Sequence, residues 1–129
     1  MAVRGIRGAT VVEKDDCLEV LAATRLLLKT VLEENQDLRI EDIASVLFSA
    51  TPDITSAFPA KAAREIGWNS VPLMSFQEIP VEGSLPYCIR ILIHWNTELP
   101  QQEIHHVYLG KARILRPDIM SADLPIDTK

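Results

Sequence analysis

Apolar and polar residues alternate most clearly in segment 87–95, where a tyrosine, three isoleucines and a tryptophan occupy every second position. Alternation with a period of two predicts a β-strand with one face in the core. The opposite face of this strand carries Cys88, Arg90, Leu92 and His94. Because the isoleucine face is typical of a core, Arg90 is expected to point away from it.

One long stretch has a helical period instead. Asp16, followed by Glu19 three residues later, is typical of a helix start, and the apolar residues that follow form one continuous stripe. This pattern predicts a long amphipathic helix that ends near Asn35. Pro59 is suited to the first position of a shorter helix, which stops at Gly67.

The remaining apolar segments are predicted to be strands. Segment 43–50 shows little polar alternation, which favours a central strand buried on both faces. Gly110 interrupts the last apolar segment, where a glycine can introduce a bulge. With one helical turn at 100–105, these elements predict an α+β fold: a mixed sheet packed against one long and one or two short helices. The predicted strands are 3–12, 43–50, 71–76, 87–95 and 106–115.

The composition is that of one globular domain. A chain of 129 residues with 47% hydrophobic content can form one ordinary core. The formal net charge of -5 argues against nucleic acid or an anionic membrane as partner, because both bind clustered lysine and arginine. Neither a signal peptide nor a membrane span of ~20 apolar residues is indicated, so a cytoplasmic location is expected. Residues 1–118 are predicted to form the domain, and residues 119–129, which lack any period, a flexible tail.

The side chains that usually provide a metal site or a nucleophile do not form one here. Cys17 and Cys88 lie far apart in apolar contexts, and both are expected to be buried free thiols. His105 and His106 are adjacent, so on a strand they face opposite ways and cannot easily share a metal. The glycine spacing matches no nucleotide-binding loop. The sequence therefore predicts neither a metal nor a cofactor.

Arginines are the residues that indicate chemistry. Arg7 and Arg90 interrupt apolar strands, and a guanidinium buried beside isoleucine is costly unless an anion meets it. Guanidinium groups bind carboxylates through two hydrogen bonds, so several that converge on one cavity would suit a compact dicarboxylate. Taken singly, each arginine is more often a surface or salt-bridge residue. The candidate polar residues are Arg7, Lys61, Arg64, Glu78, Arg90, Tyr108 and Arg116.

Several sequence blocks resemble the monofunctional, trimeric chorismate mutases. These blocks are VRGIRGAT, SATPD followed by FPAKAARE, GW then VPL, FQEIPVEGSL, CIR and HVYLGKARILRPD. They run in order from Val3 to Asp118. The resemblance implies conversion of chorismate to prephenate, a Claisen rearrangement on the route to phenylalanine and tyrosine. It also implies a pseudo-barrel homotrimer with three sites in the clefts between subunits, and no cofactor.

The resemblance assigns roles to residues at matching positions. Arg90 would contact the ether oxygen whose bond breaks and also a substrate carboxylate, while Glu78 would accept a hydrogen bond from the ring hydroxyl. Arg7 and Tyr108 would hold the side-chain carboxylate. The expected substrate-binding wall from a neighbouring subunit consists of Phe58, Ala60, Lys61, Arg64, Leu73, Met74 and Ser75. Leu115 is a further expected binding residue, and Arg116 with the tail would close the mouth.

Two features depart from the family pattern or complicate it. The family often has cysteine and a small hydroxyl residue where this chain has Ser75 and Met74. Ser75 and Glu78 are also an odd number of positions apart, so they would face opposite sides of a regular strand. A bulge or a strand end near Phe76 and Gln77 is therefore expected to turn Glu78 inward.

Two other functions are compatible with the residues alone. The arginines could form a pocket in a non-enzymatic trimeric module that binds a small anionic metabolite. They could also form only salt bridges between the subunits of a structural oligomer. Glu78 argues against the first alternative, because a carboxylate weakens the binding of any polyanion unless it meets a specific hydroxyl.

Overall fold

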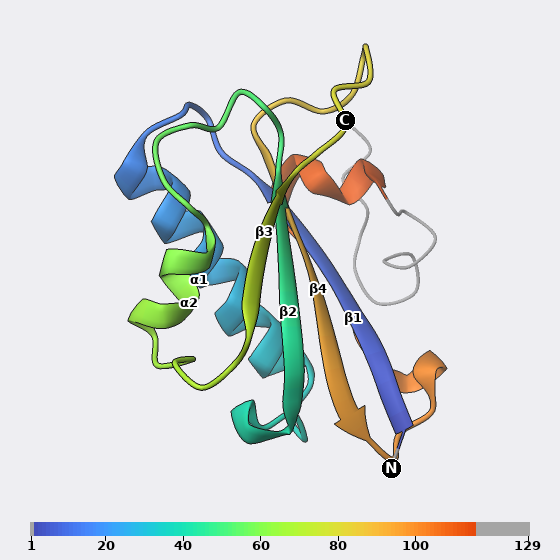
Figure 1. Ribbon diagram of the computed structural model, residues 1–129. Coiled ribbons are helices and arrows are strands. Elements are labelled where there is room, and N and C mark those ends of the chain that lie inside the picture. Colours follow the sequence, from blue (N-terminus) through green and yellow to red (C-terminus); the bar gives the residue numbers. More distant parts are fainter. Residues whose placement is uncertain (1, 116–129) are drawn as a thin grey trace.

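One five-stranded sheet organises residues 2–115, which are the residues that this computed structural model describes (Figure 1). The strands are β1 (Ala2–Val11), β2 (Ile43–Ala50), β3 (Leu73–Gln77), β4 (Cys88–Thr97) and β5 (Val107–Tyr108). Their order in the sheet is β3-β2-β4-β1-β5. The central strand β4 runs antiparallel to β1 and β2, whereas β3 runs parallel to β2 and β5 parallel to β1. The predicted α+β fold with a mixed sheet is confirmed.

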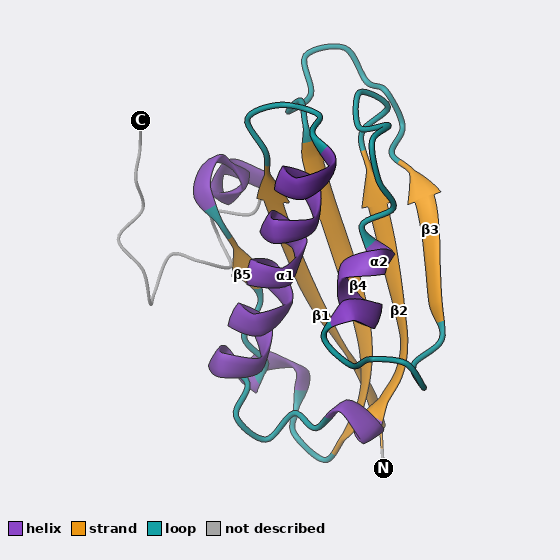
Figure 2. Ribbon diagram, turned by 90° about the vertical axis from the view of Figure 1, so that its left-hand side faces the viewer, coloured by secondary structure: helices purple, strands orange, loops and turns teal. Residues whose placement is uncertain are grey.

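Two helices cover one face of this sheet (Figure 2), namely α1 (Cys17–Glu34) and α2 (Ala60–Glu65). The N-cap residue Asp16 accepts a hydrogen bond of 3.1 Å from the backbone N–H of Glu19. At the other end of α1, the Asn35 side chain bonds both the N–H and the carbonyl of His105, each at 2.9 Å. The predicted ends of the long helix are confirmed, and its C-terminal end is tied to the chain just before β5.

The hydrophobic core lies between these helices and the sheet. The isoleucine face of β4 points into it, and the apolar stripe of α1 packs against that face. Burial in β4 alternates residue by residue, so the prediction that Arg90 points away from the core is confirmed. Side chains with no exposed surface in this core include Ile6, Leu27, Leu28, Val31, Val46, Phe48 and Ile93.

The opposite side of the sheet, which we call the open face, carries Arg7, Leu47, Ser49, Arg90, Leu92 and His94. Neither α1 nor α2 covers it (Figure 1). Among the described residues, the 3-10 turn η3 (Gly110–Leu115) packs at one end of this face, where Ala112 lies in an apolar cluster with Ala9 and Cys88. Within residues 2–115, most of the open face is therefore left uncovered by other elements.

Three expectations from the sequence prove wrong in this fold. Segment 106–115 is not one strand, because Gly110 adopts a positive φ of 57° and starts η3, while β5 contains only two residues. Strand β2 is not buried on both faces: Val46 and Phe48 have no exposed surface, whereas Leu47 and Ser49 on the open face are half-buried. Cys17 is exposed at the start of α1, whereas Cys88 is buried as expected. The other predicted elements are confirmed, with ends that differ by one or two residues.

Several predictions concern residues outside the part of the chain that the structure describes. These are the domain boundary at residue 118, the tail 119–129 and the side chain of Arg116. They stay predictions. Within residues 2–115, none of the helices has an apolar stretch of the length that a membrane span needs.

Candidate active site

Side chains from four strands form one row across the open face. In the sheet register, Ser49 of β2 is the partner of Arg90 of β4, which is also the partner of Ala9 in β1. Ala9 is in turn the partner of Tyr108 in β5. Partnered residues project to the same face of a sheet, and Arg7 shares this face because it lies two residues before Ala9. Strand pairing thus places three of the four predicted catalytic residues on one surface.

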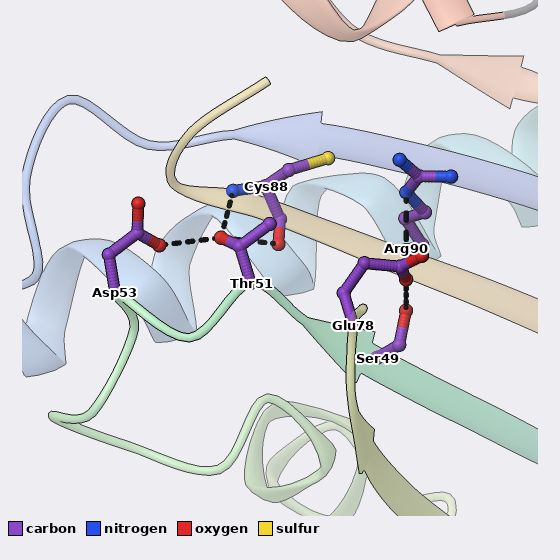
Figure 3. Close-up of polar contacts among 6 residues, drawn as sticks. All are labelled: Ser49, Thr51, Asp53, Glu78, Cys88 and Arg90. Atoms are coloured by element: carbon purple, nitrogen blue, oxygen red, sulfur yellow. Dashed lines mark hydrogen bonds and ion pairs between the residues drawn. The ribbon is translucent and has the colours of Figure 1, made fainter. Parts of the chain in front are cut away.

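Arg90 lies beside the fourth of these residues, Glu78 (Figure 3). The Glu78 Oε1 atom is 3.8 Å from Arg90 Nε and accepts a hydrogen bond of 2.8 Å from the hydroxyl of Ser49. The side chains of Arg90 and Glu78 are 26% and 28% exposed. A separation of 3.8 Å is too long for a hydrogen bond, so Arg90 Nε is a buried donor without a hydrogen-bond partner among the described residues. An acceptor atom of a ligand would satisfy this donor.

Glu78 reaches this position by ordinary alternation just after the end of β3, so the turn by a bulge or a strand end that the sequence predicted is not needed. Strand β3 pairs with β2 in unbroken register and ends at Gln77. The backbone N–H of Glu78 then donates to the carbonyl of Ala50 at 2.8 Å, which extends the pairing by one residue. Ser75 is the partner of Phe48 and faces the helix side, so Ser75 and Glu78 do face opposite sides of the sheet. Ordinary alternation is sufficient to bring Glu78 to Arg90.

A cavity of about 470 Å³ surrounds these groups on the open face. Its lining includes Arg7, Leu47, Ser49, Glu78, Arg90 and Leu92. The volume lies within the ~300–1,000 Å³ that is usual for small-molecule sites. Two guanidinium groups and one carboxylate in a partly apolar cavity suit an anionic ligand that also carries a hydroxyl group.

Tyr108 lies next to this cavity but is not among the residues that line it. Its side chain is 1% exposed and packs with Ala9, Cys88 and Ala112 in a small apolar cluster. Leu115, the last residue of η3, packs against the same cluster. Tyr108 therefore lies at the β5 end of the Arg90 row, with β1 between it and Arg90, and Leu115 packs beside it.

A second cavity, of about 430 Å³, lies at the β3 edge of the sheet, beside the loop that leads into α2. Phe58 and Ser75, two residues of the predicted substrate-binding wall, line this cavity. Phe76 and Gln77 line both cavities. Within one chain, Phe58 and Ser75 therefore belong to a different cavity from Arg90.

The other predicted wall residues are spread along α2 and β3. Ala60 is buried, whereas Lys61 and Arg64 of α2 are exposed. On β3, Leu73 is half-buried and Met74 is 58% exposed on the same side as Leu47, its partner in β2. The exposed members of this set are accessible to another molecule at the edge of the sheet.

The end of β2 also fixes the start of β4 (Figure 3). The Thr51 N–H donates to the Cys88 carbonyl at 3.0 Å, and the Cys88 N–H donates to the Thr51 hydroxyl at 3.0 Å. Asp53 accepts a hydrogen bond of 3.0 Å from the N–H of Tyr87, whose φ of 52° is uncommon outside glycine. Sequence reasoning missed these contacts, for which the SATPD block was the only signal. Burial raises the pKa of the Cys88 thiol, against the opposing effect of the Arg90 charge.

A carboxylate outside both cavities holds the loop that carries Phe58. Asp15 accepts hydrogen bonds from the N–H and hydroxyl of Thr55, at 3.0 and 2.7 Å, and from the N–H of Ser56 at 3.0 Å. Hydrogen bonds from Ser56 and Thr55 lower the pKa of Asp15 to about 2. Because Thr55 and Ser56 line the second cavity, Asp15 anchors the wall of that cavity to the turn before α1.

The chemical groups of the Arg90 cavity are fixed charges and hydrogen-bond donors. Within residues 2–115, no group of three or more His, Cys, Asp or Glu side chains is placed to hold a metal ion. The cavity can orient an anion, and its guanidinium groups can stabilise negative charge that develops on a bound oxygen atom.

Known proteins are similar to this chain in sequence and in fold. Residues 3–119 match the family model described as chorismate mutase type I. The chain is 54% identical over 120 residues to chorismate mutase AroH of Thermus thermophilus, which covers 93% of this chain and 98% of that protein. It is 49% identical over 120 residues to chorismate mutase AroH of Bacillus subtilis (strain 168), with coverage of 92% and 94%. A solved chorismate mutase from Clostridium thermocellum superimposes with a TM-score of 0.83 and 46% identity, over 85% of this chain and 97% of that one. This chain therefore belongs to the type I chorismate mutase family.

Proposed function

We propose that this protein rearranges chorismate to prephenate in clefts between the subunits of a homotrimer. Membership of the family makes it a chorismate mutase, an isomerase of aromatic amino acid biosynthesis. The observation that supports the proposed site is the buried Arg90 Nε, which has no hydrogen-bond partner among residues 2–115 and lies at a cavity shared with Arg7 and Glu78. These groups match a substrate with two carboxylates, an ether oxygen and a ring hydroxyl.

The rearrangement is unimolecular and pericyclic, so it needs no nucleophile and no proton transfer. The enzyme has to hold a flexible substrate with its reacting carbons close together, a positioning effect worth ~7–11 kcal/mol in favourable cases. It also has to stabilise the negative charge that develops on the ether oxygen as the C–O bond breaks. A fixed guanidinium in a partly desolvated cleft does this well, because it needs no reorientation during the reaction.

The four proposed catalytic residues bind the polar groups of the substrate. The planar guanidinium of Arg90 donates to the ether oxygen and to a carboxylate. Glu78 accepts a hydrogen bond from the ring hydroxyl. Arg7 binds the carboxylate of the side chain together with Tyr108, whose strand β5 lies directly beside β1.

A second subunit would complete the cleft. In a single chain the apolar part of the β3 edge is uncovered, since Met74 and Phe76 are 58% and 51% exposed. Phe58 and Ser75 line a separate cavity, which leaves them available to the site of a neighbouring chain. The proposed neighbouring wall comprises Phe58, Ala60, Lys61, Arg64, Leu73, Met74 and Ser75. The resemblance alone assigns Leu115 to substrate binding and Arg116 to the mouth of the cleft.

The non-enzymatic binding module is the less favoured function. The curated relatives carry the name of an enzyme. Glu78 would also repel a polyanion that offers it no hydroxyl group. The cytoplasmic location and the lack of nucleic-acid or membrane partners stay predictions from the composition.

The activity is tested by mixing the purified protein with chorismate and following the loss of the diene absorbance of the substrate. Saturable turnover is expected. A binding module or a structural oligomer would leave the reaction at its uncatalysed rate. Light scattering on the same sample measures the number of subunits, for which three is expected.

The shared cleft has a sharper test in mixed trimers. Arg90→Ala and Arg64→Ala are each expected to inactivate the cleft, from its two proposed sides. If the two residues come from different chains, trimers refolded from a mixture of both variants contain some clefts with neither change, and activity reappears. A mixture as inactive as each variant refolded alone would mean that both residues serve the same chain's site.

A further inference from the structure

We propose that Ser49 is a positioning residue, which keeps the Glu78 carboxylate from closing onto Arg90 and so leaves both groups free for the substrate. No role is assigned to Ser49 by the resemblance or by the relatives. The inference rests on the proposed roles of Arg90 and Glu78, and the experiment below separates a failure of those roles from a failure of this one.

The position of Ser49 is fixed by the sheet. Ser49 and Arg90 are direct partners in the register of β2 and β4, so their Cβ atoms are ~4.5–5.5 Å apart on the open face. The Glu78 backbone is held by the next residue of β2, because its N–H donates to the Ala50 carbonyl at 2.8 Å. The end of β2 therefore holds Glu78 twice, once by its backbone and once by its carboxylate.

The carboxylate is shared unequally between the two groups that it faces. The Ser49 hydroxyl is 2.8 Å from Glu78 Oε1, within hydrogen-bond distance, whereas Arg90 Nε is 3.8 Å from the same atom and outside that distance (Figure 3). One oxygen of Glu78 is thus occupied by Ser49. The other oxygen, Oε2, is left to accept a hydrogen bond from a ligand.

Without the Ser49 hydroxyl, the attraction between the two charges would decide the geometry. A carboxylate and a guanidinium prefer two parallel hydrogen bonds of ~2.7–2.9 Å. The side chains of Glu78 and Arg90 are less than a third exposed, so water screens this attraction only in part. A closed ion pair would occupy the donors of Arg90 and the oxygens of Glu78 at the same time, and the substrate would have to compete for both.

The first test is Ser49→Ala, assayed with chorismate. The expected result is a rise in KM and a fall in kcat/KM on the order of 10–100-fold, by analogy with the loss of a group that orients a metal ligand. Ser49→Thr retains the hydroxyl on a residue suited to strands, and it should restore kcat/KM to within a few-fold of wild type. The matched control is Ser45→Ala, on the same strand and face, where the Ser45 hydroxyl lies 2.7 Å from His94 Nδ1. This control should leave kcat/KM unchanged.

The decisive test repeats Ser49→Ala in a Glu78→Ala background. With no carboxylate to restrain, the second change should alter kcat/KM by less than about twofold. Equal losses from Ser49→Ala with and without Glu78 would overturn the proposal, because Ser49 would then act independently of Glu78. The single variant Glu78→Ala tests the proposed role of Glu78, because full activity in this variant would reject that role. The effect of Ser49→Ala with and without Glu78 would still test the role of Ser49.

A structural readout accompanies the kinetics. In a crystal structure of the Ser49→Ala protein, the distance from Glu78 to Arg90 should shorten to hydrogen-bond length. A separation that stays near the 3.8 Å of the present structure would overturn the proposal whatever the activity. The same crystal shows whether the variant has kept its fold.

Discussion

The two faces of the sheet differ in how deeply the chain buries their side chains. On the helix-covered face, Ile93 and Trp95 of β4 pack within the chain and are buried. On the open face, Arg90 and Leu92 of the same strand are only half-buried. Because its side chains alternate, strand β4 contributes one face to the buried core and the other face to a half-buried surface.

The helix-covered face is expected to matter mainly for stability, and the open face mainly for function. A face that buries apolar side chains within the chain contributes directly to the free energy of unfolding. A face with half-buried arginines and leucines contributes less, and we have proposed that a ligand and a second chain cover it. Substitutions on the two faces should therefore change different measurements.

The largest effect is expected from a truncation on the helix-covered face. Phe48 of β2 has no exposed surface, so Phe48→Ala should lower the free energy of unfolding by ~3–5 kcal/mol through lost burial and a residual cavity. Urea unfolding at a fixed protein concentration measures this change. A loss below about 1 kcal/mol would mean that the core does not depend on this face in the way described.

The next effect concerns catalysis on the open face. Arg90→Ala should lower kcat by about 10²–10³-fold, or ~3–4 kcal/mol, by analogy with the loss of one donor to a developing oxyanion. Arg90→Lys retains the charge but not the planar fork, so it should also be severely impaired. Near-wild-type turnover of the lysine variant would contradict the role of the guanidinium. Arg25, whose side chain pairs with Glu65 at 3.0 Å, provides the control, and Arg25→Ala should keep full turnover.

A smaller effect is expected on assembly. Phe76 is 51% exposed on β3, so burying the exposed half of its ring against a second chain would be worth about half of the ~1.5–3 kcal/mol of a full side chain. Phe76→Ala should therefore raise the dissociation constant of the proposed trimer several-fold to about tenfold for each interface, as measured by analytical ultracentrifugation. Leu26→Ala removes a side chain that is 59% exposed on α1, on the helix side, and should leave assembly unchanged. If both variants dissociated equally, β3 would not be part of the interface between subunits.

The smallest effect depends on pH and tests the loop beside the second cavity. The pKa of Asp15 is lowered from 3.8 to about 2 in the folded chain, so its contribution to stability is complete above pH ~4 and is lost as the pH falls toward 2. Asp15→Asn should thus be less stable than wild type at neutral pH, with a gap that closes between pH ~4 and ~2. Thermal unfolding at several pH values measures it. Thr55→Val removes one of the hydrogen-bond donors to Asp15. The pKa of Asp15 should then be lowered by a smaller amount, and the loss of stability at neutral pH should be smaller than in Asp15→Asn.

Local patterns predicted most of the elements because helix and strand periods are local properties. The alternation around Arg90 and the cap at Asp16 are read within a few residues, and both predictions were confirmed. The C-terminal segment was predicted wrongly, since the left-handed conformation of Gly110 turns the chain into η3. Cys17 was placed in the core from its apolar neighbours, although the first residue of α1 is exposed.

By itself, the sequence determined which side chains share a face of each strand, and hence that Arg90 points away from the isoleucine core. Only the tertiary structure decided that β4 lies between β1 and β2, which brings Arg90 beside Arg7, Ser49 and Glu78. Ser49 and Glu78 are 29 positions apart, yet they share a hydrogen bond at the end of β2. The direction of a side chain follows from the period of its own strand, whereas its neighbours depend on strand order and register, which arise from contacts between distant segments.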